Sequence, residues 1–252
     1  MKTFASSVAI AVASLAFAGS ASAQAPSPPA APATPPVSPY KLTLDAGLVN
    51  ASGNTDVTTF NAGDRFEYKG SSAGFAQFLN AIYGRASDSV TTEQIKAGMR
   101  VDVKLVSIVH GFVSGTYERN RFAGIARRFE EAAGLALRMI DIPTDLWTVE
   151  LGSSVNQEHS TAAVSRDYVA LRVASLYRHN FTKTANLTEA AEVLPDLEDS
   201  RNLLVNSETA LVAPLSGHVA FKVSYVVKFD NLPEPGFKKT DRVLSSGLQI
   251  AF

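Results

Sequence analysis

Histidines and carboxylates are the residues of this sequence whose types could do chemistry. The histidines are His110, His159, His179 and His218. A lipase-type site on a strand needs His-x-Ser on one face, and none of the four is followed by that pattern. No two of them stand at a short metal-ligand spacing, and the chain has no cysteine, so neither a zinc site nor a thiolate nucleophile is predicted.

Two carboxylate pairs also draw attention, Glu130-Glu131 and Glu198-Asp199. Adjacent residues of a strand point to opposite faces, so neither pair is arranged as a catalytic dyad. The sequence therefore predicts no catalytic residue, no metal site and no cofactor. Its net charge of -1 over 252 residues gives no reason to expect nucleic acid as a partner.

Long segments of alternating polarity must position the remaining polar residues. The clearest runs from Gln94 to Leu105, where Ile95 and its alternate neighbours are apolar and the residues between them are Gln, Lys, Gly, Arg or Asp. Twelve residues at about 3.3 Å each, tilted near 45°, span roughly 28 Å, the height of a bilayer core. Soluble sandwiches usually have strands of about five or six residues, so length favours a membrane barrel.

Such segments recur to the end of the chain and predict about twelve strands. They cover residues 41–50, 57–69, 73–85, 94–105, 108–119, 127–140, 147–158, 167–179, 185–193, 202–212, 218–230 and 242–252. An even number returns the chain to the side where it began, so both ends of a closed antiparallel barrel can be periplasmic. Two details remain open: segment 73–85 has an ambiguous phase, with Phe75 and Leu79 competing against Phe78 and Ile82, and Asp64 falls on an apolar face.

The closing segment sets the phase. Leu248, Ile250 and Phe252 share one face of an extended strand, and the chain ends on the aromatic ring. This ending resembles the C-terminal signature of bacterial outer-membrane barrels, which their assembly machinery reads. The alternative is the last strand of a soluble β-sandwich that ends in Phe.

With Phe252 facing outward, charged residues collect on the inner face, because Arg or Lys facing lipid at mid-membrane would cost about 2 to 4 kcal/mol each. The predicted lumen-facing residues are Arg65, Glu67, Lys96, Arg100, Asp102, Lys104, Arg128, Glu130, Glu150, Arg172, Arg178, Glu192, Glu208, Lys222 and Lys228. They favour either a narrow charged channel or a salt-bridged lumen that conducts little. Lys96, Arg100 and Lys104 form a cationic ladder that could attract anions, whereas Asp102 within it favours pairing.

The first 39 residues predict a signal peptide followed by a linker. Residues 1–23 have one cation at Lys2, an apolar run and a terminal Ala21-Ser22-Ala23, which is typical of a cleaved signal peptide. Residues 24–39 are rich in Pro, Ala and Ser and favour an extended periplasmic linker without a core. Residues 40–252 then form the barrel.

Several motifs in this order resemble the YdiY-like family, which carries a domain of unknown function (family 481) and is labelled as salt-induced outer-membrane proteins. The matching motifs are Gly53-Asn54-Thr55-Asp56, Tyr117 to Gly124 with Arg128-Phe129-Glu130-Glu131, Val193 to Asp199, and Pro235-Gly236. The resemblance covers roughly residues 40–252. It implies a Gram-negative outer-membrane barrel without an established activity.

Together these features predict an all-β, transmembrane antiparallel barrel of about twelve strands. The expected role is non-enzymatic, either a small pore or a structural wall protein. A lipid-modifying enzyme and a soluble periplasmic β-protein are the alternatives. Expected partners are outer-membrane lipid and, through the closing strand, the barrel-assembly machinery, while the oligomeric state stays open.

Overall fold

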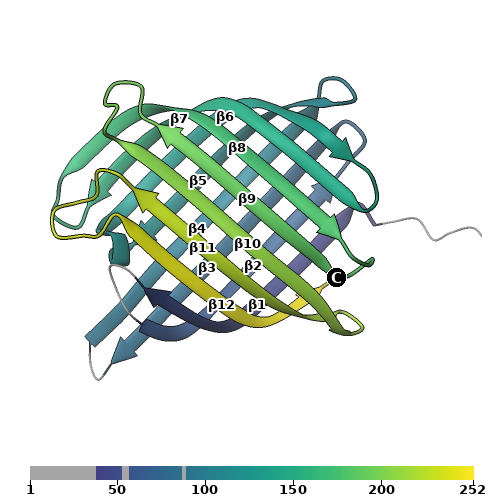
Figure 1. Cartoon of the computed structure of the whole chain (residues 1–252), viewed down its shortest axis with the longest axis horizontal. Coiled ribbons are helices and arrows are strands. Elements are labelled where there is room, and N and C mark those ends of the chain that lie inside the picture. Colours follow the sequence, from purple (N-terminus) through teal and green to yellow (C-terminus); the bar gives the residue numbers. More distant parts are fainter. Residues whose placement is uncertain (1–37, 53–56, 87–88) are drawn as a thin grey trace, which may run out of the picture. The chain divides into compact units, whose positions relative to one another are not determined.

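The computed structural model describes residues 38–52, 57–86 and 89–252, and these form a closed antiparallel barrel of twelve strands (Figure 1). The strands are β1 (Tyr40–Ser52), β2 (Val57–Lys69), β3 (Ala73–Ala86), β4 (Ser89–Lys104), β5 (Val109–Asn120), β6 (Ile125–Asp141), β7 (Asp145–Ser160), β8 (Ser165–Asn180), β9 (Asn186–Pro195), β10 (Leu203–Ser216), β11 (Val219–Asp230) and β12 (Thr240–Ala251). The all-β barrel prediction is confirmed. The predicted signal peptide and most of the linker lie outside the described residues.

Each strand pairs with its neighbours in sequence, and β1 pairs with β12 to close the ring. At the seam, Leu42 N donates to Phe252 O over 3.1 Å and Phe252 N donates to Leu42 O over 2.8 Å. The ring therefore has no open edge in which backbone groups lack partners. None of the described helical residues forms a helix of the length and apolarity needed to cross a membrane.

Alternation along each strand separates two faces. On the outer face large apolar side chains are exposed, including Phe60 at 72%, Met99 at 61% and Val113 at 64%. A continuous exposed apolar surface of this kind suits lipid rather than water. The ambiguous strand β3 takes the phase in which Leu79 is exposed and Ile82 is buried.

The strand ends define two ends of the barrel. At the terminal end, β1 begins and β12 finishes, and the turns are 70–72, 105–108, 142–144, 181–185 and 217–218. The described connections at the opposite end, here called the loop end, are the 3-10 helix η1 (Arg121–Ala123) with Gly124, and residues 161–164, 196–202 and 231–239.

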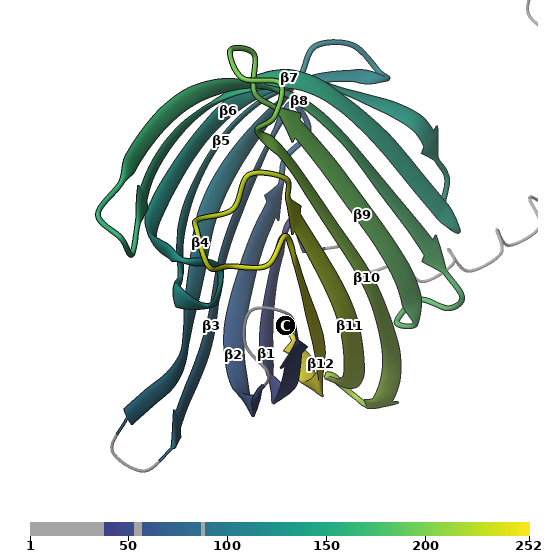
Figure 2. The same ribbon diagram turned by 60° about the vertical axis from the view of Figure 1, so that its left-hand side comes forward.

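The connection 231–239, here called the strap, reaches across the loop end (Figure 2). It leaves β11 and returns to β12, yet the ring of Phe237 lies against Gly124, between η1 and β6. Because β12 and β6 stand opposite each other in the ring of twelve strands, this contact spans the opening. Gly124 has φ +75, a conformation that glycine adopts without strain, and a Cβ there would lie 2.8 Å from the Phe237 ring.

Apolar groups inside the barrel form separate patches rather than one core. The buried clusters are Tyr168, Ala170, Leu194 and Leu204; Phe112, Ala132 and Ala136; and Val49 with Ile82. The first joins β8, β9 and β10, and the second joins β5 and β6. Apolar filling therefore holds parts of the wall and leaves polar residues in the space between.

Two predicted strands differ most from the observed ones. Strand β4 begins at Ser89 rather than near Gln94, and β10 runs to Ser216 rather than ending near Val212. Pro214 has no backbone N–H and therefore indicates a turn, but the ladder accommodates it through a register shift between Pro214 and Ser216.

Substitution of Gly247 tests the closing seam. Gly247 of β12 faces Gly47 of β1, and a Cβ on it would overlap the Ala46 carbonyl oxygen. We expect Gly247→Val to destabilise the closed barrel by about 2 kcal/mol through this overlap and to reduce the heat-modifiable folded band on gels. Gly115→Val is the matched control, because nothing lies within 4 Å of a Cβ there. Equal folding of both variants would contradict the tight seam.

Candidate functional site in the barrel interior

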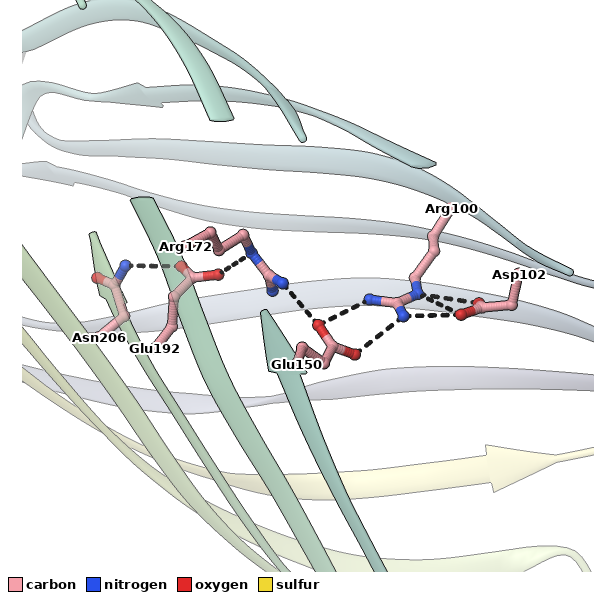
Figure 3. A network of polar contacts seen from close by, with 6 residues as sticks. All are labelled: Arg100, Asp102, Glu150, Arg172, Glu192 and Asn206. Atoms are coloured by element: carbon pink, nitrogen blue, oxygen red, sulfur yellow. Dashed lines mark hydrogen bonds and ion pairs between the residues drawn. The ribbon is translucent and has the colours of Figure 1, made fainter. Parts of the chain in front are cut away.

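A chain of ion pairs crosses the interior from β4 to β9, and a hydrogen bond extends it to β10 (Figure 3). Arg100 Nη2 lies 2.7 Å from Asp102 Oδ1 and 2.9 Å from Glu150 Oε1. Arg172 Nη1 donates to Glu150 Oε2 over 2.6 Å, and Arg172 Nε donates to Glu192 Oε2 over 2.7 Å. Carboxylates and guanidinium groups alternate along this chain, so each charge has an opposite charge beside it.

Two arginines of this network stack on one aromatic ring. The guanidinium carbons of Arg100 and Arg172 lie 4.3 Å and 5.2 Å from the ring centroid of Phe112, which is only 3% exposed. A planar guanidinium stacks well on such a ring, and the contact is worth about 1 kcal/mol when partly desolvated. Asn206 extends the network by donating from Nδ2 to Glu192 Oε1 over 3.2 Å. The ring of Phe112 and the amide of Asn206 thus both hold the charged groups of the network in place.

A second charged cluster lies nearer the loop end. Lys228 Nζ donates to Glu118 Oε1 over 2.5 Å, joining β11 to β5 across the interior. Arg128 Nε donates to Glu158 Oε2 over 2.7 Å, and Arg128 Nη1 lies 3.9 Å from Glu118 Oε2. The Glu118 and Arg128 side chains are only 8% and 12% exposed. This cluster and the strap together narrow the loop end.

A cavity of about 510 Å³ remains in the interior, lined by the wall that runs from β7 through β12 and β1 to β4. Its wall includes Lys96, Glu208, Lys222 and the amides of Asn61 and Asn80. Lys222 Nζ lies 3.3 Å from Asp45 Oδ2, whose other oxygen accepts from Gln249 Nε2. The volume is in the range that holds a small molecule.

Comparison of the sequence with known proteins shows the family of this chain. The model of the family described as "Protein of unknown function, DUF481" matches residues 44–252. The chain belongs to the DUF481 family. The uncharacterized protein YdiY of Escherichia coli (strain K12) is 24% identical over 205 residues, covering 81% of this chain and 80% of YdiY. The resemblance seen in the sequence is thereby confirmed.

Solved structures share the fold of this DUF481 chain. A NanC porin structure aligns with a TM-score of 0.54 at 9% identity, covering 82% of this chain and 98% of NanC. The translocator domain of the autotransporter NalP from Neisseria meningitidis aligns with a TM-score of 0.47 at 11% identity, covering 86% and 89%. At such identities the likeness to NanC establishes the fold alone, which is that of outer-membrane barrels.

The structure brings most of the charged residues singled out by sequence into contact with the cavity or the two clusters. Those that line the cavity are Arg65, Lys96, Arg100, Glu150, Arg172, Glu192, Glu208, Lys222 and Lys228. Asp102 and Arg128 belong to the ion-pair clusters. Glu67 lies 3.4 Å from Arg65, whose side chain is 51% exposed.

Three further residues stand apart from these groups. Lys104 is exposed at the last position of β4, Arg178 Nε donates to Thr188 Oγ1 over 3.4 Å, and Glu130 is half-buried. Of the expected cationic ladder, Arg100 is bound by two carboxylates while Lys96 faces the cavity. The three cations therefore do not act as one continuous anion path.

Sequence reasoning missed several residues of the site. Glu118 and Glu158 complete the loop-end cluster, Asp45 pairs with Lys222, and Phe112 carries the two guanidinium groups. The sequence could have indicated the three acids, because each lies an even number of positions from a polar residue that faces inward on the same strand. Phe112 gave no such signal, since an apolar residue in a barrel strand is expected to face lipid.

The outer wall carries the closing residues. Leu248, Ile250 and Phe252 are exposed at 51%, 37% and 65%. The ring of His218 stacks on Phe252 with centroids 5.8 Å apart, and His218 Nδ1 lies 2.9 Å from the Ala251 carbonyl oxygen. These contacts hold the last residues of β12 in place beside the turn that precedes β11.

The carboxylates of Asp196 and Asp199 form hydrogen bonds within the 196–202 connection. Asp196 accepts from the backbone N–H groups of Glu198 and Asp199, and from Asn202 Nδ2. The guanidinium of Arg201 donates to Asp199 and lowers the pKa of Asp199 to about 2. Asp199 therefore stays ionised through the physiological pH range and keeps this pairing.

Loss of Glu150 tests the central network. Glu150 is the only carboxylate among the described residues that contacts both Arg100 and Arg172, so Glu150→Gln leaves two guanidinium groups facing each other. We expect a loss of about 3 kcal/mol in the free energy of unfolding, measured by urea titration of Trp147 fluorescence in detergent. Glu67→Gln is the control, with a loss below about 1 kcal/mol because its partner is exposed. Equal losses in the two variants would contradict a central role for Glu150.

Proposed function

We propose that this DUF481 protein is an outer-membrane barrel that forms a narrow pore for small polar solutes. The observation that carries the proposal is a cavity of about 510 Å³, with charged and amide side chains in its lining, inside a wall whose outer face is apolar. A purely structural barrel has no need to keep water-accessible charges such as Glu208 inside its wall. Twelve strands lie between barrels that side chains fill and barrels with wide aqueous channels, so a narrow path suits the strand number.

In this proposal the terminal end faces the periplasm and the loop end faces outward. The signal peptide predicted for residues 1–23 is cleaved after Ala23, and residues 24–39 remain as a periplasmic linker. The terminal-end turns are short, as periplasmic turns of bacterial barrels generally are. Leu248, Ile250 and Phe252 then present the assembly signal at the periplasmic side, and lipid covers the apolar wall.

A structural wall protein is the second candidate, favoured by the ion pair between Lys228 and Glu118 and by the strap. Both features join opposite sides of the barrel and narrow its loop end. An enzymatic role lacks comparable support. His179 contacts Asp145, and His218 contacts a carbonyl oxygen, but no serine or threonine hydroxyl within the described ranges donates to a histidine.

Fractionation of cells tests the location. We expect the protein to sediment with outer membranes, to resist extraction by high salt and alkaline carbonate, and to dissolve only in detergent, because its exposed wall is apolar. The C-terminal variant Phe252→Ala is expected to reduce the amount in this fraction, and Phe60→Ala, on the same face, serves as its control. Release of the wild-type protein by carbonate alone would exclude an integral barrel.

Bilayer recordings test the pore. We expect refolded protein to give small stepwise currents, and Phe237→Ala to give larger or longer steps, because the strap then loses its contact with Gly124. Leu197→Ala is the control, since Leu197 is an exposed residue of another loop-end connection. A flat baseline from wild type and from Phe237→Ala would remove the pore and favour the wall protein.

A further inference from the structure

The inward face of the cavity wall contains two charged residues that the wall leaves unpaired. The other charged groups of this face contact opposite charges, through the Arg100 network, the Lys222–Asp45 pair and the Lys228–Glu118 pair. Asp64 also lines the cavity and forms no ion pair within the described residues, but it shares the outward strand phase of the exposed Phe60. Arg65 is held more loosely by Glu67. Within the described part of the chain, Lys96 and Glu208 form neither an ion pair nor a side-chain hydrogen bond.

The acids nearest Lys96 attract it without a direct contact. Glu118, which stands beside it in the ladder between β4 and β5, and Glu130 both interact with its charge. The Glu118 oxygens contact Lys228 and Arg128, and within the described residues neither acid forms an ion pair with Lys96. Glu208 stands beside Val226 and Ala190, which offer no charge. Each unpaired group therefore turns toward the cavity without a fixed protein partner.

The two residues lie on opposite walls. Strands β4 and β10 are six places apart in either direction around the ring of twelve. Both strands run toward the terminal end, where β4 finishes at Lys104 and β10 at Ser216, so Lys96 and Glu208 each lie eight positions from the end of their strand. They stand at comparable heights, with the cavity between them.

Amide groups surround the cationic side. Asn80 stands beside Lys96 in the ladder between β3 and β4, and both line the cavity. Asn61, on the next strand, also lines it, and its buried Oδ1 has no hydrogen-bond partner.

We propose that the cavity binds a small zwitterionic solute, with its carboxylate at Lys96 and Asn80 and its ammonium group at Glu208. A lone anion would leave Glu208 unpaired and a lone cation would leave Lys96 unpaired, whereas one molecule with both charges compensates both groups. The cavity volume admits a molecule of amino-acid size. The inference rests on the proposed pore for the entry of solute, but binding itself is measured separately from conduction.

Calorimetric titration of refolded protein in detergent tests this site. The probes are 4-aminobutyrate, 5-aminovalerate and 6-aminohexanoate, which separate the two charges by increasing lengths. We expect at least one of them to bind, and butyrate and butylamine to bind at least about 10-fold more weakly, as the loss of one charged hydrogen bond implies. Absence of binding by all three zwitterions would overturn the proposal, as would equal binding of the single-charge probes.

Variants identify the residues involved. Lys96→Met and Glu208→Gln are each expected to weaken binding about 10-fold or more, while Lys104→Met and Glu67→Gln, whose side chains lie away from the cavity lining, leave it unchanged. The exchange K96E with E208K is expected to restore binding, because the solute can bind in reverse. Unchanged binding in both single variants of folded protein would overturn the assignment.

Bilayer recordings of the same preparations separate this inference from the pore itself. Solute binding without any current would leave the site standing and remove the pore. Currents without zwitterion binding would keep the pore and remove the site.

Discussion

Closure of the backbone between β1 and β12 is the constraint on which the whole structure depends. Lipid offers no hydrogen bonds, so every strand N–H and C=O must find a partner within the sheet. The paired bonds between Leu42 and Phe252 complete the ring at its last residue. The close approach of Gly47 and Gly247 lets the two strands meet without side chains between them. An even number of antiparallel strands, with β1 beginning and β12 finishing at one end of the barrel, follows from this closure.

Closure also decides where charge is placed. Each strand must present apolar groups to lipid, so alternation sends ionised groups to the interior, where they have to be neutralised by one another. Arg100, Glu150 and Arg172 solve this by alternating sign over the ring of Phe112. Buried pairs of this kind are weak evidence for stability, but the pair of Arg100 with Glu150 links β4 to β7, which are not neighbours in the sheet.

The sequence predicted the strands and the face of most charged residues, because period-two alternation is local and one residue, Phe252, sets the phase. It could not predict partners across the interior. Lys228 and Glu118 are 110 positions apart and meet only through the size of the ring and its stagger. The sequence could not show which face of β3 points outward, because Phe78 lines the cavity and both faces of that strand are therefore apolar. Pro214 indicated an end that a register shift removes.

The interior is divided rather than evenly narrowed. The network from β4 to β10 and the buried cluster of Tyr168, Leu194 and Leu204 occupy one side, and the cavity extends from that network to β1, β2 and β12. A proposed solute path would then follow the side that contains the closing seam. Selectivity on such a path depends on a few side chains at one height and not on the net lumen charge, which is nearly balanced. A single unpaired residue such as Glu208 can therefore matter more than the paired charges around it.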